Sequence, residues 1–244
     1  MTMTFHWPQI VWCVLTFTGL AFTSVQHGKP MEGCHNFMVR FVKALVAVWL
    51  LWCGGFFSQA NAAEPPTAAL KYRSDVIRSA RVDWGLNAPV ADVAAQLHQE
   101  SGWNPAARSP VGAEGLAQFM PSTADWIAGL MPHLVAREPY NPGWAIRALV
   151  SYDRWLWQRV AVPDGCERMA MTLSAYNGGL GWVNRDRRLA RMRGLDDTRW
   201  FGAVETVNAG RSAANWRENR HYPQRILHTL APRYLSWGGS SCVG

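Results

Sequence analysis

The chain has 244 residues, of which 49% are hydrophobic and 17% charged. This composition excludes a disordered or low-complexity protein and leaves enough apolar residues for a core. The net charge is +7, and most of it comes from residues 63–244, which hold 20 Arg and one Lys against 16 acidic residues. An arginine-rich surface suits an acidic polymer, such as nucleic acid, anionic lipid or an anionic cell-wall glycan, and charge alone does not choose among them.

Two apolar runs precede residue 63. Ile10 to Val25 forms the first, with no Lys or Arg before it. The second, residues 44–57, follows Arg40 and Lys43 and precedes Ala60-Asn61-Ala62. A short basic start, an apolar run and an Ala-x-Ala site are the three parts of a secretory signal peptide, and the run is shorter than the roughly 20 residues of a membrane span. We therefore predict cleavage after Ala62.

The sequence leaves two interpretations of the N-terminus. Met38 lies two residues before Arg40, so a chain that starts there has a signal peptide over residues 38–62. Residues 1–37 are then an upstream extension of the reading frame or a non-native N-terminus. In the competing interpretation, residues 10–25 are a membrane anchor. Either way, we expect a linker over 63–70 and one domain over 71–238.

Helical spacing dominates this domain, and alternating strand patterns are almost absent. One helix begins near Lys71 and breaks at Asn87-Ala88-Pro89, and a second covers residues 90–101 and stops at Gly102. Residues 103–115 are typical of a loop, and 194–215 are a long loop or an insertion. Further helices are expected from residue 121 onward and over 143–160, 166–176 and 221–235. The predicted fold class is mainly α.

Cysteine and histidine usage gives no sign of a metal site. Of the five cysteines, only Cys166 and Cys242 follow residue 62, and their spacing does not show whether they pair. The histidines of this part lack the paired helical spacing of a zinc enzyme; they are His98, His133, His221 and His228. We expect no metal and no cofactor.

Glu100 is the residue that most needs an explanation. It shares one face of the second helix with Val93 and Leu97, at positions i, i+4 and i+7. A carboxyl group on an apolar face loses solvation, so its pKa rises toward the range in which it acts as an acid near neutral pH. The alternative is an ordinary glutamate at a helix end whose side chain reaches solvent, and periodicity alone favours that alternative.

The surrounding sequence reverses this preference. Three blocks, in family order, resemble the signature of the soluble lytic transglycosylase (SLT) family. The first runs from Gln99-Glu100-Ser101-Gly102-Trp103-Asn104-Pro105 through Ser109-Pro110-Val111-Gly112 to Glu114-Gly115-Leu116-Ala117-Gln118-Phe119-Met120. The others are Ala175-Tyr176-Asn177-Gly178-Gly179 and Glu218-Asn219-Arg220-His221-Tyr222. The resemblance implies a single catalytic domain with a lysozyme-like fold of the α+β superfamily.

The resemblance also implies a reaction with Glu100 as its single acid and base. Glu100 would protonate the β-1,4 oxygen between N-acetylmuramic acid (MurNAc) and N-acetylglucosamine (GlcNAc) in peptidoglycan. It would then take the proton of the C6 hydroxyl, which closes on C1 as a 1,6-anhydro end. One carboxyl group performs both steps because its first action leaves it as the base for the second. Most glycoside hydrolases need two carboxyl groups.

The other matched residues have simpler expected roles. Gly112 and Gly115 lack a Cβ, which permits close approach to a sugar or a positive φ. Glu218 is expected to be structural, holding the C-terminal helix near the cleft, and Tyr222 is expected to lie within reach of Glu100. Substrate binding is expected for Ser109, Gln118, Met120, Tyr176, Asn177 and Tyr222; for Ser109 a simple turn role is the alternative.

Two further sequence features bear on binding. Among the tryptophans after residue 62, Trp103 is the candidate for stacking on a sugar, because it follows the catalytic block directly. A basic segment contains Arg185, Arg187, Arg188, Arg191 and Arg193. In an exported protein we interpret it as a solvated surface that contacts acidic wall polymers, not as a nucleic-acid site.

Two rival functions remain at this point. Glu114 is either a solvated loop residue or, if it reaches the scissile bond, the second carboxylate of a hydrolase similar to goose-type lysozyme. The other rival is a non-catalytic wall-binding module of the same fold, which would have no need of a buried acid. The chain departs from the family pattern at Ala117, Leu180 and Asn219, which puts glycan preference in doubt.

The expected partner is the peptidoglycan glycan strand, met in the periplasm by a monomeric protein. The protein is membrane-associated if the N-terminal segments are retained. Wall recycling, service to a secretion or conjugation machine, and phage lysis are equally compatible with the sequence.

Overall fold

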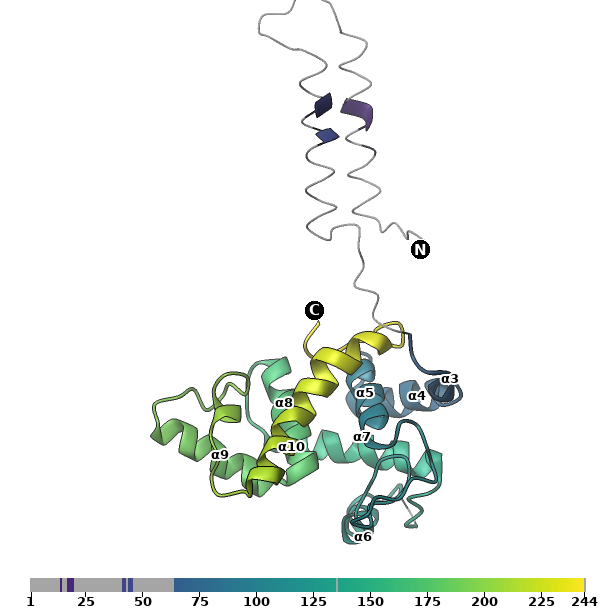
Figure 1. The fold of residues 1–244 in the computed structure, drawn as a ribbon. Coiled ribbons are helices and arrows are strands. Elements are labelled where there is room, and N and C mark those ends of the chain that lie inside the picture. The colour runs from purple at the N-terminus through teal and green to yellow at the C-terminus, as the bar shows by residue number, and fades with distance from the viewer. Residues whose placement is uncertain are drawn as a thin grey trace, which may run out of the picture. The chain divides into compact units, whose positions relative to one another are not determined.

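The structure is a computed structural model (Figure 1), and it describes residues 14, 17–19, 41, 42, 44, 45, 64–134 and 136–243. The chain divides into two units, Met1–Ala62 and Ala63–Gly244. The predicted upstream extension, signal peptide and cleavage site lie, apart from a few single residues, outside the described residues. Among the helices of the described ranges, none has the length and apolar character of a membrane span.

The second unit is helical, as predicted. Its helices are α3 Thr67–Leu70, α4 Arg73–Trp84, α5 Val90–Ser101, α6 Pro121–Leu130, α7 Pro142–Arg159, α8 Gly165–Gly178, α9 Leu180–Met192 and α10 Ala213–Gln224. α10 continues into a π-helical turn, Arg225–Leu230, and a 3₁₀ turn, Ala231–Tyr234, and another 3₁₀ turn covers Val204–Thr206. Within the described residues β-structure is limited to isolated bridges.

Local sequence explains where several helices begin. The side chains of Asn141, Asp164 and Ser212 accept hydrogen bonds from backbone N–H groups in the first turns of α7, α8 and α10. These N–H groups have no partner within the helix, so a short polar side chain before the first turn fixes the boundary. Pro121 and Pro142 open α6 and α7, where the missing N–H of proline costs nothing.

The predicted helices are present, except that the one expected over 221–235 begins at Ala213 and changes its winding after Gln224. α9 was missed. Its buried face consists of Val183, Asp186 and Ala190. The polar residue in this short stripe interrupts the apolar pattern, and the arginines around it suggested only a solvated segment. The loop expected over 194–215 is confirmed up to Ser212, with one 3₁₀ turn inside it.

α5 is the central element of this unit. Residues 90–97 are all buried, and the helix packs against α4, α7 and both helical turns that follow α10. The C-terminal run, coloured yellow in Figure 1, passes along α8 through α10 and then along α5. Tyr222 of α10 is thereby brought to the C-terminal end of α5.

The chain end is fastened to the same core. Cys166 and Cys242 form a disulfide, which joins the tail to the first turn of α8. The neighbouring Ser241 N–H donates to Asp92 Oδ2 at 2.8 Å. The sequence left this pairing open, and the structure supplies it.

Candidate active site

Glu100 lies in the last turn of α5, where the backbone turns sharply. Gly102 and Trp103 both have positive φ, 58° and 71°, and the Gly102 N–H donates to the His98 carbonyl at 3.0 Å. Two successive left-handed residues end the helix and lead the chain into the loop of residues 104–120. The Ser101 hydroxyl donates to the Leu116 carbonyl at 2.8 Å and so holds this loop against the end of α5.

The environment of Glu100 favours its protonated form. Burial raises the pKa of its carboxyl group to about 8; the hydrogen bond from Tyr222 lowers the pKa and the negative charge of Glu218 raises it further. The Tyr222 hydroxyl donates to Glu100 Oε1. The expected proximity of Tyr222 to Glu100 is therefore confirmed, and its role toward a substrate stays a prediction.

Tyr176 joins α8 to the loop beside Glu100. Its hydroxyl donates to the Ala117 carbonyl at 2.8 Å, and its ring packs 5.5 Å from that of Phe119 and 5.4 Å from that of Tyr152. Burial, together with the nearby Glu100 charge, raises the pKa of Tyr176 well above its ordinary value. This phenol is therefore a fixed neutral wall of the site.

A hydrogen-bonded chain links α8 to α10 at the other side. The Asn219 amide donates to the Ser174 carbonyl and to Asn177 Oδ1, each at 2.9 Å. Asn177 in turn donates to Glu218 Oε1 at 3.4 Å. Asn219, one of the departures from the family pattern, thus connects the two later motif blocks through side-chain amides.

The loop of the first block is held largely by its own polar groups. Gln118 has φ 51°, and its amide donates to the carbonyls of Ala107, at 3.2 Å, and Gly115, at 2.8 Å. The Ser109 hydroxyl accepts from the Ala113 N–H at 2.9 Å. Both N–H groups of Gln118 are therefore engaged within the loop, which leaves its carbonyl oxygen for any substrate. Ser109 thus has the turn role that was the alternative for it, and its role toward a substrate stays a prediction.

The two glycines of this loop differ in what surrounds them. Gly112 and Gly115 both have positive φ, 90° and 74°. A Cβ on Gly115 would lie 1.7 Å from the Pro139 carbonyl oxygen, whereas a Cβ on Gly112 would meet nothing within 4 Å. The close approach at Gly115 is thus to another loop of the protein and not to a sugar. Met120 follows the loop and is 40% exposed at the start of α6.

Glu114 is neither solvated nor unpaired. Its side chain is 13% exposed and forms an ion pair with Arg137. The same guanidinium lies 3.4 Å from Asp125 Oδ1. The expectation of a solvated loop residue is therefore wrong, and the carboxylate serves to fasten the loop.

The prediction for Trp103 is also wrong. Its side chain is 1% exposed, stacks on Tyr72 at 5.9 Å and donates from Nε1 to the Tyr234 hydroxyl at 2.8 Å. Its positive φ directs the ring into the core, where no sugar reaches it. The basic segment is largely the solvated surface that was expected, since Arg185, Arg188, Arg191 and Arg193 are exposed. Arg187 is partly buried and pairs with Asp197 at 3.5 Å.

Sequence reasoning missed one buried acid near the site. Asp153 of α7 is 1% exposed and accepts a hydrogen bond from Gln96 Nε2 at 3.3 Å. Gln96 lies one helical turn before Glu100 on α5. Burial, and the nearby charge of Glu100, raise the pKa of Asp153 well above its ordinary value. The signal was present, since Asp153 lies four residues after the buried Leu149 on the apolar face of α7.

Comparison with known proteins agrees with these motifs. Residues 83–198 match the family model of the transglycosylase SLT domain. Over these residues the chain is similar to an SLT domain. Membrane-bound lytic murein transglycosylase F of Vibrio cholerae serotype O1 is 33% identical over 183 residues, which cover 67% of this chain and 32% of the relative. The enzyme of the same name from Thiobacillus denitrificans is 36% identical over 126 residues, covering 52% of this chain and 24% of the relative.

The fold of this part of the chain is also the expected one. A solved complex of the 70-kDa soluble lytic transglycosylase with bulgecin A matches with a TM-score of 0.50 and 22% identity, over 84% of this chain and 29% of that chain. This likeness concerns the fold alone, and it confirms the predicted lysozyme-like class. The chain spans about a third of the length of the Vibrio cholerae relative and about a quarter of that from Thiobacillus denitrificans.

Proposed function

We propose that this protein is a peptidoglycan lytic transglycosylase that cleaves the MurNAc-β-1,4-GlcNAc bond and leaves 1,6-anhydromuramoyl ends. The observation that carries the proposal is the Glu100 carboxyl group, whose pKa is raised to about 8 by burial at the end of α5. At neutral pH this group is mostly protonated, as an acid catalyst must be when the substrate arrives.

The reaction then needs one carboxyl group and no water. Glu100 donates its proton to the glycosidic oxygen while the C1–O bond breaks, which releases the GlcNAc 4-hydroxyl. The Glu100 carboxylate next accepts the proton of the muramoyl C6 hydroxyl while O6 bonds to C1. This second transfer returns Glu100 to its protonated form. The Tyr222 hydroxyl, bonded to Oε1, stabilises the carboxylate between the two transfers and leaves Oε2 for the substrate.

The other acids near the site support a single-carboxylate mechanism. Glu114 is held by Arg137, and Asp153 is buried against Gln96. The charge of Glu218 acts on Glu100, but the Glu218 carboxylate accepts a hydrogen bond from the Asn177 amide. A hydrolase would need one of these three acids to activate a water or stabilise the sugar cation.

The relatives named above as membrane-bound lytic murein transglycosylases support the choice of substrate. We extend the proposal to an exported monomer that acts in the periplasm, with residues 38–62 removed as a signal peptide and residues 71–238 as the catalytic domain. The mass of the exported protein tests this extension, because a product that retains residues 1–37 contradicts it.

Product chemistry tests the reaction. Purified sacculi are digested with the protein, and the released muropeptides are weighed before and after borohydride reduction. We expect disaccharide-peptides one water lighter than hydrolysis products and resistant to reduction. The Glu100→Gln variant, which keeps the shape of the side chain but has no acidic proton, is expected to bind sacculi and release nothing.

The other outcomes contradict the proposal in different ways. Reducible products of full mass indicate a lysozyme-type hydrolase, and Glu114→Gln and Glu218→Gln then identify its second carboxylate. Absence of release by the folded protein, with binding intact, indicates a wall-binding module. Unchanged turnover by Glu100→Gln removes Glu100 from the mechanism.

A further inference from the structure

A groove of about 440 Å³ is lined by Glu218 at one of its walls. The ends of three helices form its walls, with Asn177 and Gly178 from α8, Trp182 from α9, and Asn215 and Glu218 from α10. Arg211, in the loop before α10, also lines it. Because the charge of Glu218 acts on Glu100, the groove lies near the proposed catalytic site.

Two helix N-termini open on this groove. Trp182 lies in the first turn of α9, whose N-terminus has no side-chain cap, and Asn215 lies in the first turn of α10. The N-terminal turns of both helices carry partial positive charge, which favours an anion near them. The groove is also lined by one carboxylate, that of Glu218 in the second turn of α10.

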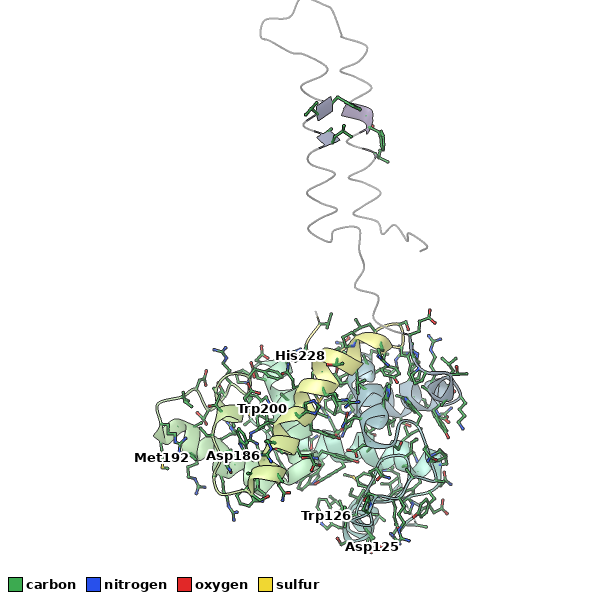
Figure 2. All side chains as sticks on the ribbon, viewed as in Figure 1. Asp125, Trp126, Asp186, Met192, Trp200 and His228 are labelled. Carbon is green, nitrogen blue, oxygen red and sulfur yellow. A yellow bond between two sulfur atoms is a disulfide. The ribbon has the colours of Figure 1, made fainter. Side chains whose placement is uncertain are left out.

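A buried guanidinium adds a full charge to the same wall. The Arg211 side chain is 4% exposed, and its Nη2 lies 3.3 Å from Asp186 Oδ2. Arg220 Nη2 donates to the same oxygen at 2.7 Å, so two cations share one carboxylate. Asp186 projects from α9, where Figure 2 labels it. One arginine would neutralise the Asp186 carboxylate. Because two arginines contact it, the cluster retains one positive charge.

The hydrogen bonds of Arg211 are also incomplete. Its Nε atom is buried without a hydrogen-bond partner in the described part of the chain, and its Nη2 atom, although ion-paired with Asp186, forms no hydrogen bond either. Its Nη1 lies against the backbone of Gly178, where a Cβ would approach it to 2.7 Å. Buried donors of this kind normally have partners. At Trp182, the guanidinium groups of Arg185 and Arg211 lie 4.7 Å and 5.5 Å from the ring centroid, which concentrates positive charge further.

We propose that this groove binds a carboxylate carried by the glycan strand, at its Arg211 end. The inference rests on the proposed function and adds a substrate class to it. The carboxylate has two possible sources in peptidoglycan: the lactyl group of muramic acid that has lost its peptide, and the peptide stem. The side-chain amides of Asn177 and Asn215 are suited to the neutral sugar groups beside it.

The test places one negative charge in the groove. Asn215 is exposed at the third position of α10, where an acidic residue stabilises the helix, so Asn215→Asp is expected to fold. Ala214→Asp is the matched control: it carries the same charge in the same exposed helical turn, but residue 214 does not line the groove. Both changes are made in the full chain with Glu100→Gln, so that bound strands are not cleaved.

Three probes separate the possible ligands. They are neutral chitooligosaccharides, peptide-free glycan strands and peptide-bearing strands, and affinity is measured by titration at low salt. We expect Asn215→Asp to weaken binding of a carboxylate-bearing probe about five- to tenfold and to leave the neutral probe unchanged. Ala214→Asp is expected to change neither. A loss confined to peptide-free strands identifies the lactyl carboxylate, and a loss confined to peptide-bearing strands identifies the stem.

Three results overturn the inference. They are an equal loss of affinity in both variants, an equal loss of affinity for the neutral probe, and no loss of affinity at all. Failure of the proposed function is distinguished by the protein with Glu100 intact. If that protein forms 1,6-anhydro ends while Asn215→Asp leaves affinity unchanged, only the groove is wrong. If it forms none, the proposed function is wrong whatever the titrations show.

Discussion

The environment of Glu100 sets the pH range in which its carboxyl group is protonated and can act as an acid. Its carboxyl group has a pKa of about 8, raised by burial from an ordinary value of 4.5. A raised pKa means that the protonated form is present below pH 8 and is lost above it. We therefore expect kcat/KM on glycan strands to hold through neutral pH and to fall tenfold per unit once the pH passes about 8.

The alkaline fall is measured as the pH profile of kcat/KM, for the unmodified protein and for Glu218→Gln. Glu218 raises the pKa of Glu100, so removal of its charge is expected to move the alkaline fall to lower pH. A fall that starts near pH 5 in the unmodified protein contradicts the assignment of a buried acid.

Tyr222 acts on the same pKa with the opposite sign. Its hydroxyl donates to Glu100 and lowers the pKa of that carboxyl group. Tyr222→Phe is therefore expected to move the alkaline fall to higher pH. It is also expected to lower kcat about ten- to a hundredfold, because a hydrogen bond to a charged group contributes about 1.5–3 kcal/mol.

Tyr176→Phe is the matched control for Tyr222→Phe. It removes a hydroxyl that is bonded to the Ala117 carbonyl and not to Glu100. We expect the alkaline fall to stay in place in this variant. A shift of equal size in both variants indicates that a change in packing, and not the bond to Glu100, is responsible.

At the scale of elements, the loop before α6 depends on one close contact. A Cβ on Gly115 would lie 1.7 Å from the Pro139 carbonyl oxygen, so Gly115→Ala must push two backbone segments apart. We expect this change to cost about 3 kcal/mol or more of unfolding free energy, from positive-φ strain and overpacking together. Urea unfolding measures it, and activity is expected to fall because the loop packs on α5.

Gly112→Ala is the control within the same loop. Gly112 has a φ of 90°, but a Cβ there would meet nothing within 4 Å. Its cost should be limited to backbone strain, about 1–2 kcal/mol. If both variants lose the same stability, the contact with Pro139 does not determine the loop.

Local patterns in the sequence predicted what depends on neighbours along the chain. The apolar stripe and Gly102 predicted α5 with its observed bounds, and a resemblance of motifs placed Tyr222 near Glu100. α9 was missed because its buried face contains Asp186, whose partners are arginines more than twenty residues away. Trp103 was misassigned because its burial depends on Tyr234 and Tyr72, which no local pattern connects to it.

At the scale of the whole unit, the C-terminal run completes the site by wrapping around α5. It supplies Tyr222 to Glu100 and continues to Tyr234, whose hydroxyl bonds the ring of His98 at 2.8 Å. Further along the run, Cys242 forms the disulfide with Cys166. The geometry of Glu100 thus depends on a segment more than a hundred residues away, which the disulfide fastens at its end.

The disulfide is expected to stabilise this arrangement through the unfolded chain. The two cysteines are 76 residues apart, and closure of a loop of that length contributes about 4 kcal/mol by restricting the unfolded state. We expect the double variant Cys166→Ser and Cys242→Ser to lose that much unfolding free energy, measured as a lower midpoint of urea unfolding. Its turnover at 25 °C should stay close to normal, because neither cysteine touches Glu100 or Tyr222.

Reductant should lower the midpoint of the unmodified protein to the same value and leave the variant unchanged. A midpoint that responds neither to the double substitution nor to reductant would show that the tail is held by its other contacts, such as the bond from Ser241 to Asp92.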